Sequence, residues 1–139
     1  MTARFHDDGA TLSSFADEVL VVCPRCGERA VSAGGRLTCA ACGLAKEATG
    51  TTTTWGAPVD PWFGEPLWLT DSVAGHVLWA FNRRHLEVLR AFVAADLRER
   101  TPTQGAPASM VEELPGWLTD AKHRTEALRA LDRLLARTT

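Results

Sequence analysis

Four cysteines carry the clearest chemical signal in this chain of 139 residues. They form two C-x-x-C pairs, Cys23 with Cys26 and Cys39 with Cys42, and a glycine directly follows each pair. Two thiolates three residues apart on a tight turn can share one metal ion, and glycine lets the backbone fold beneath the ion without a Cβ clash. Four sulfur ligands would fill a tetrahedral site and leave no position for water or substrate. The pattern therefore predicts one structural Zn²⁺ ion per chain.

The segments around the cysteine pairs are expected to form short strands. Residues 28–38 should run out and back as a hairpin that turns at Gly34 and Gly35, which returns the second pair to the first. Residues 19–22 form a short apolar run suited to a preceding strand, and residues 44–49 are suited to a last strand. This arrangement is that of a zinc ribbon.

Other chemistry for the four thiols is less favoured. Two disulfides would suit a secreted chain, but residues 1–15 are polar and contain Asp7 and Asp8 where a signal peptide needs an apolar stretch, so a cytoplasmic location is expected. A redox pair would need one C-x-x-C at a junction between a strand and a helix, whereas the two pairs in this chain flank a predicted hairpin. A mononuclear iron at the same four thiolates remains an alternative to zinc.

Composition limits the classes of partner. The formal net charge is -2, so no global field attracts nucleic acid. The apolar stretches are interrupted by charge well short of the ~18 residues that a membrane span requires, so the protein is expected to be soluble without a membrane partner.

An aromatic segment follows the predicted ribbon. Trp62 and Phe63 stand between Pro61 and Gly64, where the backbone must be irregular. A rigid loop that displays large rings can anchor a protein partner or stack on bases, so both residues are candidates for partner binding. The alternative is that the two rings only pack at the junction between the ribbon and the helices.

The middle of the chain predicts a second hairpin and a helix. Residues 67–70 and 76–81 are rich in strand formers, and residues 71–75 are expected to form a five-residue loop between them. Helical spacing of apolar residues then extends over 83–99, with Asn82 as the N-cap. One long helix from His76 onward is the alternative.

The C-terminal part is expected to be helical. Residues 109–112 read as a capping box that opens a short helix, Pro115 interrupts it, and a bent final helix should break near His123. Its predicted apolar face consists of Trp117, Ala121, Leu128, Leu131 and Leu135. A basic stripe on this helix supplies four further candidates for contacts to phosphate or to an acidic partner, although a solvated surface is the alternative reading: Lys122, Arg129, Arg133 and Arg137.

These elements predict an α+β fold in which an N-terminal four-cysteine zinc ribbon and a β-hairpin pack with a small C-terminal helical unit. The expected organisation is an N-terminal arm over 1–17, the ribbon over 18–50, and an aromatic β-hairpin with a helical unit over 51–139.

No catalytic motif accompanies the cysteines. His85 and Glu87 match the H-x-E of zinc-dependent nucleobase deaminases, but the P-C-x-x-C that should follow is missing, because both cysteine pairs precede His85. His85 falls within the apolar arc of its helix and is expected to be a buried, hydrogen-bonded imidazole.

Two resemblances add to this picture. The runs C-P-R-C-G and C-A-A-C-G resemble the zinc ribbons of the transcription-factor-IIB type, which implies the four cysteines as ligands and implies no mechanism. The runs D-P-W-F-G-E-P-L-W-L, H-V-L-W-A-F-N-R-R-H-L and L-P-G-W-L-T-D-A-K-H-R resemble bacterial zinc-ribbon-containing proteins without an assigned activity.

The sequence thus predicts a non-enzymatic zinc-binding interaction protein. We expect an adaptor or accessory factor that contacts a protein component of nucleic-acid machinery, with at most weak, salt-dependent binding to nucleic acid by the protein alone. One alternative is an enzyme or enzyme subunit with a pocket between hairpin and helices around His85 and Trp79. Another is a structural subunit of an assembly.

Overall fold

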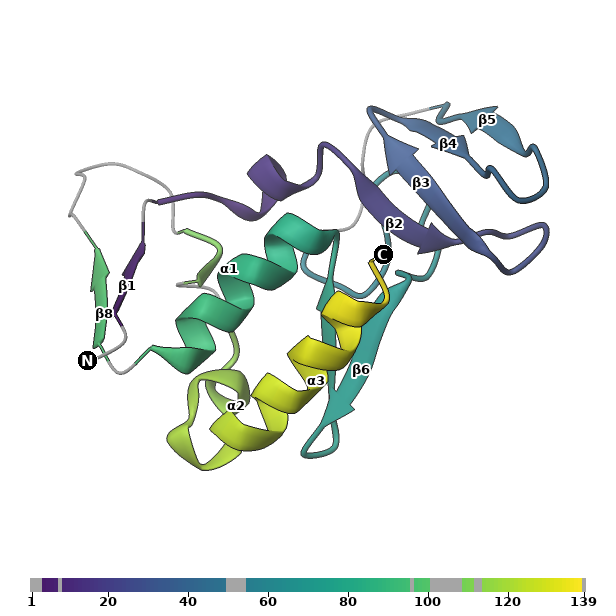
Figure 1. Ribbon diagram of the computed structural model, residues 1–139. Coiled ribbons are helices and arrows are strands. Elements are labelled where there is room, and N and C mark those ends of the chain that lie inside the picture. The colour runs from purple at the N-terminus through teal and green to yellow at the C-terminus, as the bar shows by residue number, and fades with distance from the viewer. Residues whose placement is uncertain are drawn as a thin grey trace.

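The computed structural model describes residues 4–7, 9–49, 55–95, 97–100, 109–111 and 114–138. Within these residues the protein has the predicted α+β fold, with antiparallel sheets, helices and one parallel strand pair. Figure 1 shows the four-stranded cysteine-bearing sheet at one end and the pair β1 and β8 at the other, with helices α1 and α3 between them. No helix among the described residues is both long and apolar enough to span a membrane.

The predicted ribbon is confirmed as a four-stranded antiparallel sheet in the order β2-β3-β4-β5. Its strands are β2 (Val19–Val22), β3 (Arg29–Ala33), β4 (Arg36–Thr38) and β5 (Ala45–Glu47). Alternation along β3 buries Ala30 and Ser32 and turns their neighbours outward, as expected for a sheet with one packed face.

Strand β2 joins the ribbon to the rest of the molecule through its second edge. The N–H of Leu20 donates to the C=O of Phe81 at 2.8 Å, and the C=O of Leu20 accepts from the N–H of Trp68 at 3.0 Å. Val21 forms an antiparallel bridge with Leu67. The backbone groups of β2 are therefore paired on both sides, which anchors the cysteine-bearing sheet to the hairpin.

The second hairpin has a shorter turn than the sequence suggested. Strands β6 (Leu69–Val73) and β7 (His76–Ala80) pair as far as Val73 opposite His76. The prediction of a five-residue loop over 71–75 is wrong, because Ala74 and Gly75 alone make the turn, with φ of 50° and 83°. Two successive positive φ values give the type I′ turn that matches strand twist, and Val73 remains buried as the last residue of β6.

Helix α1 (Arg83–Ala94) begins at the predicted cap. The Asn82 side-chain oxygen accepts from the N–H of His85 at 2.9 Å, and its amide group donates to the carbonyls of Phe15 and Glu18. The helix ends five residues earlier than predicted. The chain becomes extended at Ala95, and β8 (Leu97–Arg100) pairs in parallel with β1 (Arg4–Asp7), so tertiary pairing overrides local helical propensity.

The N-terminal arm is more ordered than predicted. Besides β1 it contains a 3₁₀ turn, η1 (Leu12–Phe15), which places Phe15 in the core. The Ser109 hydroxyl, which was expected to cap a short helix, donates a hydrogen bond to the Asp7 carboxylate, and Val111 has 3₁₀ geometry. Glu112, the other half of the predicted capping box, lies outside the described residues.

The C-terminal helix is bent, as predicted. It consists of α2 (Gly116–Thr119), the 3₁₀ turn η3 (Ala121–His123) and α3 (Arg124–Ala136), and Asp120 separates the first two. Ala121 is exposed, so its predicted place on the apolar face is wrong, because the face turns at this break. Helix α3 packs against α1 and β6 through four residues: Ala127, Ala130, Leu131 and Leu134.

One hydrophobic core connects all these parts. It extends from Val19 and Leu37 in the ribbon through Leu69 and Phe81 of the hairpin to Leu131 of α3. Burial of this apolar surface, at about 25 cal/mol per Å², is the main force that holds the cysteine-bearing sheet against the helices.

Candidate metal centre

The four cysteine sulfurs meet at one end of the ribbon. The Sγ atoms of Cys23 and Cys42 are 3.7 Å apart, those of Cys26 and Cys39 are 3.6 Å apart, and all four lie within 4.8 Å of one another. Four sulfurs at ~2.3 Å around a tetrahedral zinc ion are separated by about 3.8 Å. A disulfide would need about 2.05 Å, so the cysteines are free thiols in a metal-binding arrangement.

Both cysteine turns have the same backbone geometry. In each, the N–H of the first cysteine, Cys23 or Cys39, donates to the carbonyl five residues later. The glycine that follows the pair, Gly27 or Gly43, donates its N–H back to the carbonyl of that first cysteine at 2.9 Å. These glycines have φ of 79° and 80°, a conformation that other residues adopt only with strain.

The electrostatics of the thiol cluster favour a bound cation. Burial acts to raise the pKa of Cys23, but hydrogen bonds from the backbone of Cys26 and Arg25 and from the neighbouring thiols lower it to about 6. A backbone hydrogen bond at Glu28 acts to lower the pKa of Cys26, yet burial and the three other thiols raise it to about 12. One thiolate forms readily and a further negative charge beside it is opposed, so four thiolates together require a positive ion between them.

The residues present fit a zinc ion. Cys23, Cys26, Cys39 and Cys42 would hold it, and its chemistry would be structural because all four positions are protein sulfurs. The arrangement is thus a closed four-cysteine metal site on a ribbon sheet. No protein-family model, curated protein or solved structure matches this chain.

A third turn of the same kind contacts the other end of the ribbon sheet, near the turn between β3 and β4. We call residues 60–65 the aspartate loop. The N–H of Asp60 donates to the carbonyl of Glu65 at 2.9 Å, and the N–H of Gly64 donates to the carbonyl of Asp60 at 3.0 Å. Gly64 has a φ of 70°. These are the two hydrogen bonds and the glycine of the cysteine turns.

The strand register around the three turns is also the same. The residues before and after the cysteine turns pair as Val22 with Arg29 and Thr38 with Ala45, and the aspartate loop is closed by a bridge between Val59 and Pro66. In each case the residue directly before the six-residue turn pairs with the residue directly after it. The aspartate loop is therefore a cysteine-type turn without cysteines.

In this loop the Asp60 carboxylate takes the place of a cysteine sulfur as the acceptor of backbone N–H groups. Asp60 is fully buried, and its Oδ1 accepts from the N–H groups of Trp62 and Phe63 at 3.0 and 2.9 Å. Its Oδ2 accepts from the N–H of Glu65 at 2.9 Å, and Ser32 of β3 donates its hydroxyl to Oδ1 at 3.2 Å. Backbone donors thus converge on the carboxylate, and no metal is needed to hold the turn.

Sequence reasoning missed this loop although a signal was present. Residues 23–28 read C-P-R-C-G-E and residues 60–65 read D-P-W-F-G-E, so proline, glycine and glutamate occupy equal positions. The match does not extend to the cysteines, because Asp60 replaces the first cysteine and Phe63 replaces the second.

The loop places the two aromatic candidates on the ribbon, not at the junction between ribbon and helices. Both rings are half-buried. Trp62 packs beside Gly35 at the tip of the β3–β4 hairpin and lies edge-to-face with Trp55, with ring centroids 6.1 Å apart. The Lys46 ammonium of β5 lies 5.4 Å from the centroid of Phe63.

The four basic candidates are spread over η3, α3 and the residue that follows α3, and most of their charge has a partner within the chain. Arg133 pairs with Asp71 at 2.9 Å, and the Arg137 guanidinium lies 4.7 Å from the Trp68 ring centroid. Lys122 is 3.9 Å from the carboxylate of Asp120. Arg129, in turn, is exposed and has no ion pair with the described residues.

His85 is buried and hydrogen-bonded, as predicted. It is 2% exposed, and its Nδ1 accepts from the N–H of Phe81 at 3.0 Å. Burial, assisted by the charge of Arg84, lowers the pKa of His85 to about 4, so the ring is neutral at physiological pH.

Proposed function

We propose that this protein is a non-catalytic interaction protein whose structural zinc ribbon, of the transcription-factor-IIB type, supports a binding surface for a protein component of nucleic-acid machinery. The metal is not part of a reaction, because four sulfur ligands leave no open position on the ion. Its role is to hold strands that are too short to be stable alone.

One observation carries this proposal: the aspartate loop holds Trp62 and Phe63 in place before any partner arrives. Its backbone is fixed by hydrogen bonds to Asp60, and both rings remain half-exposed beside an exposed lysine, Lys46. A pre-ordered aromatic anchor loses little conformational entropy on binding, which is what interface hot spots require.

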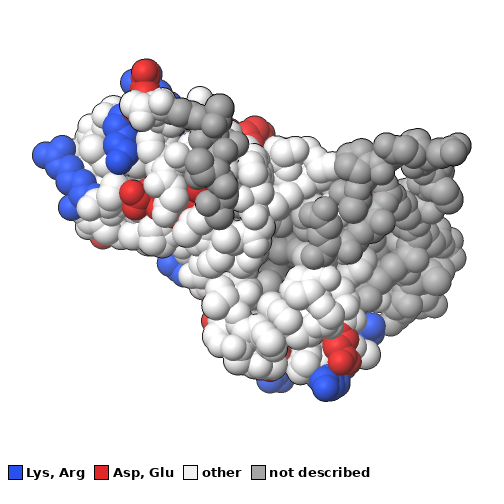
Figure 2. Space-filling model, turned by 180° about the vertical axis from the view of Figure 1, so that it is seen from behind, with Lys and Arg blue, Asp and Glu red and all other residues white. Residues whose placement is uncertain are grey.

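The charge distribution supports a protein partner over direct nucleic-acid binding. Figure 2 shows the described basic side chains at the margins of the rear face, interspersed with acidic ones and separated by a wide uncharged area. Because Arg133 has an internal ion pair, the stripe offers fewer free charges than the four counted in the sequence.

Capture from native extract tests the proposal. Tagged wild-type protein should retain a partner after nuclease treatment, and Trp62→Ala and Phe63→Ala should each weaken its capture at least tenfold. Glu65→Ala, in the same loop and outside the aromatic pair, is the matched control. Equal capture by the aromatic variants would contradict the proposed surface.

Direct nucleic-acid binding is tested by titration of fluorescent oligonucleotides at low and physiological salt. We expect weak binding that disappears at physiological salt, since at most about four phosphate contacts are available. Tight binding that persists at physiological salt would overturn the preference for a protein partner.

A further inference from the structure

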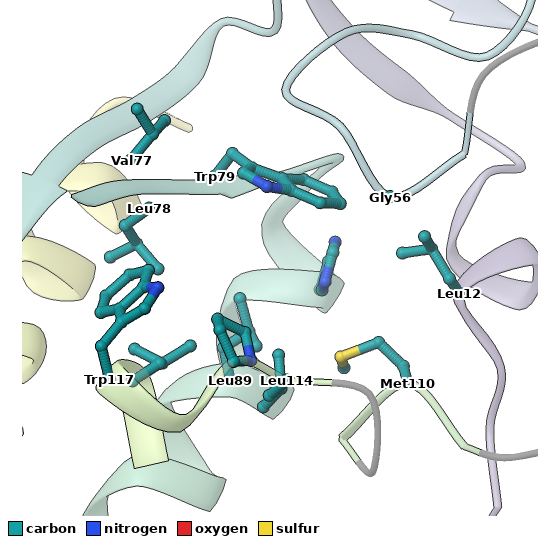
Figure 3. Close-up of a pocket in the computed structure, with 12 residues that line it drawn as sticks. Leu12, Gly56, Val77, Leu78, Trp79, Leu89, Met110, Leu114 and Trp117 are labelled. Carbon is teal, nitrogen blue, oxygen red and sulfur yellow. The ribbon is translucent and has the colours of Figure 1, made fainter. Parts of the chain in front are cut away.

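A cavity of about 380 Å³ lies away from the metal centre, between β7, α1 and the segment that leads into α2. Figure 3 shows Trp79 of β7 on one side, Leu89 of α1 and Leu114 opposite, Trp117 at one end, and Leu12 and Met110 at the other. Its volume is within the range of ~300–1,000 Å³ that small-molecule pockets occupy.

The walls of this cavity are apolar and partly aromatic. Aliphatic side chains make most of the surface, and the indole rings of Trp79 and Trp117 add two flat faces. No lysine, arginine, aspartate or glutamate is among the described residues that line it. A charged ligand would lose its hydration here and gain no counter-charge, so the walls select an uncharged molecule.

His85 brings a polar group to this apolar space. Its Nδ1 is occupied by the N–H of Phe81, so the neutral ring carries its proton on Nε2. In the described part of the chain this Nε2–H has no hydrogen-bond partner, although the residue is 2% exposed and lines the cavity. The Nε2–H therefore opens on the cavity, where the acceptor of a bound molecule can take the place of water.

The imidazole is held firmly in this orientation. Phe15 stacks on one face with ring centroids 5.1 Å apart, and Trp79 meets the ring edge-to-face at 5.8 Å. The backbone N–H of His85 also donates to the side-chain oxygen of Asn82, which holds the residue in place. The donor is therefore pre-positioned, which is characteristic of a recognition site.

We propose that this cavity binds a small uncharged molecule that has an aromatic or aliphatic body and one hydrogen-bond acceptor, and that His85 Nε2–H donates to that acceptor. We propose a binding role for this site, in which His85 is the one titratable side chain among the described lining residues. This inference is independent of the proposed ribbon surface.

Three probes of similar size test the proposal on the unmodified protein: acetophenone, which carries an acceptor, ethylbenzene, which lacks one, and benzoate, which is charged. Nuclear magnetic resonance of the indole N–H groups gives an internal control, because Trp79 and Trp117 line the cavity and Trp62 and Trp68 do not. Acetophenone should shift the first two signals saturably and change the His85 Nε2 signal. It should bind about tenfold more tightly than ethylbenzene, and benzoate should not bind.

A pair of variants confirms the location. Leu114→Trp fills the cavity from its half-buried rim and should abolish the shifts, whereas Leu128→Trp, at a half-buried position of α3 outside the cavity, should preserve them. His85→Phe, if it folds, should erase the preference for acetophenone over ethylbenzene. Absence of saturable binding by acetophenone, equal affinity for the two uncharged probes, or tight binding of benzoate would each overturn the proposal.

Discussion

The cysteine turns and the aspartate loop have the same backbone but are held by different chemistry. In the turns, cysteine sulfurs converge on the position of a metal ion, and the N–H of Arg25 points to the sulfur of Cys23 at 3.4 Å. In the loop, the carboxylate of Asp60 accepts the equivalent N–H of Trp62 at 3.0 Å. One geometry would be completed by an external ion, and the other is completed within the chain.

This difference explains what each turn displays. A cysteine turn must direct its second cysteine, Cys26 or Cys42, at the ion. The aspartate loop is released from that requirement, so the equivalent position holds Phe63 and the position before it holds Trp62. The metal-free turn can therefore present a second aromatic ring, Phe63, at the position where a metal-bound turn requires a cysteine.

Loss of the metal should separate the two regions most strongly. Cys39→Ser, or removal of zinc by a chelator, should unfold the cysteine-bearing strands, because thiolate zinc binding contributes on the order of 10 kcal/mol or more. Circular dichroism and zinc analysis measure the effect. Ala41→Ser, an exposed change in the same turn, is the control. A ribbon that stays folded without metal and with reduced thiols would contradict the structural role.

Removal of the carboxylate should break the loop and spare the metal. Asp60→Ala leaves the N–H groups of Trp62, Phe63 and Glu65 without their acceptor, at about 1–3 kcal/mol for each buried group that water cannot reach. We expect a loss of about 4 kcal/mol in the free energy of unfolding by urea, with zinc content unchanged. Asp120→Ala, at an exposed aspartate, should cost far less; an equal loss would refute the role of Asp60.

Acid should destabilise the hydrophobic core around His85 as well as the thiolate site. Because His85 has a pKa of about 4 when folded and an ordinary value of 6.5 when unfolded, the unfolded chain binds more protons between these values. The stability present above about pH 6.5 should therefore fall as the pH drops to 4, by about 3 kcal/mol. The ring signals of His85 should stay constant from pH 7.5 to 5, and a titration near pH 6.5 would show that the ring is not buried.

The turn glycines should show the same strain with different consequences. A Cβ at Gly27 or Gly64 meets no atom within 4 Å, so alanine there costs only the strain of positive φ, about 1–2 kcal/mol. Gly27→Ala should lower zinc affinity about tenfold in competition with a chelator. Gly64→Ala should lower stability and leave zinc affinity unchanged. If Gly64→Ala lowered zinc affinity and Gly27→Ala did not, the aspartate loop would depend on the metal.

The aromatic pair should matter least for folding. Trp62 is half-buried and packs on a hairpin tip, so Trp62→Ala should change the free energy of unfolding by about 1 kcal/mol or less. Thermal denaturation measures this. A large loss of stability would assign the ring to the core and remove it from the proposed binding surface.

The sequence predicted the clustering of the four cysteines well because its signal is local. The spacing of Cys23, Cys26, Cys39 and Cys42 and the turn at Gly34 and Gly35 determine a closed site almost without the rest of the chain. Asn82 as a helix cap and His85 as a buried ring were also predicted, since both follow from the periodicity of one helix.

Two of the failures concern contacts between distant segments, and a third concerns a local turn. The early end of α1 depends on pairing of residues 97–100 with residues 4–7, and no pattern in the local sequence predicts that pairing. Likewise, the fourfold hydrogen bonding of Asp60 depends partly on Ser32, which lies 28 residues away. The short hairpin turn was missed because Ala74 occupies a positive-φ position that usually requires glycine or asparagine.

X-ray absorption at the zinc edge tests the central claim most directly, because it reads the ligands of the ion in the purified protein. The structure predicts one zinc per chain with four sulfur neighbours at ~2.3 Å and no nitrogen or oxygen ligand. An oxygen or nitrogen in the first shell would indicate an open position on the metal, and a folded, reduced protein without metal would show that the cysteines have another role. Either result would contradict a structural zinc ribbon.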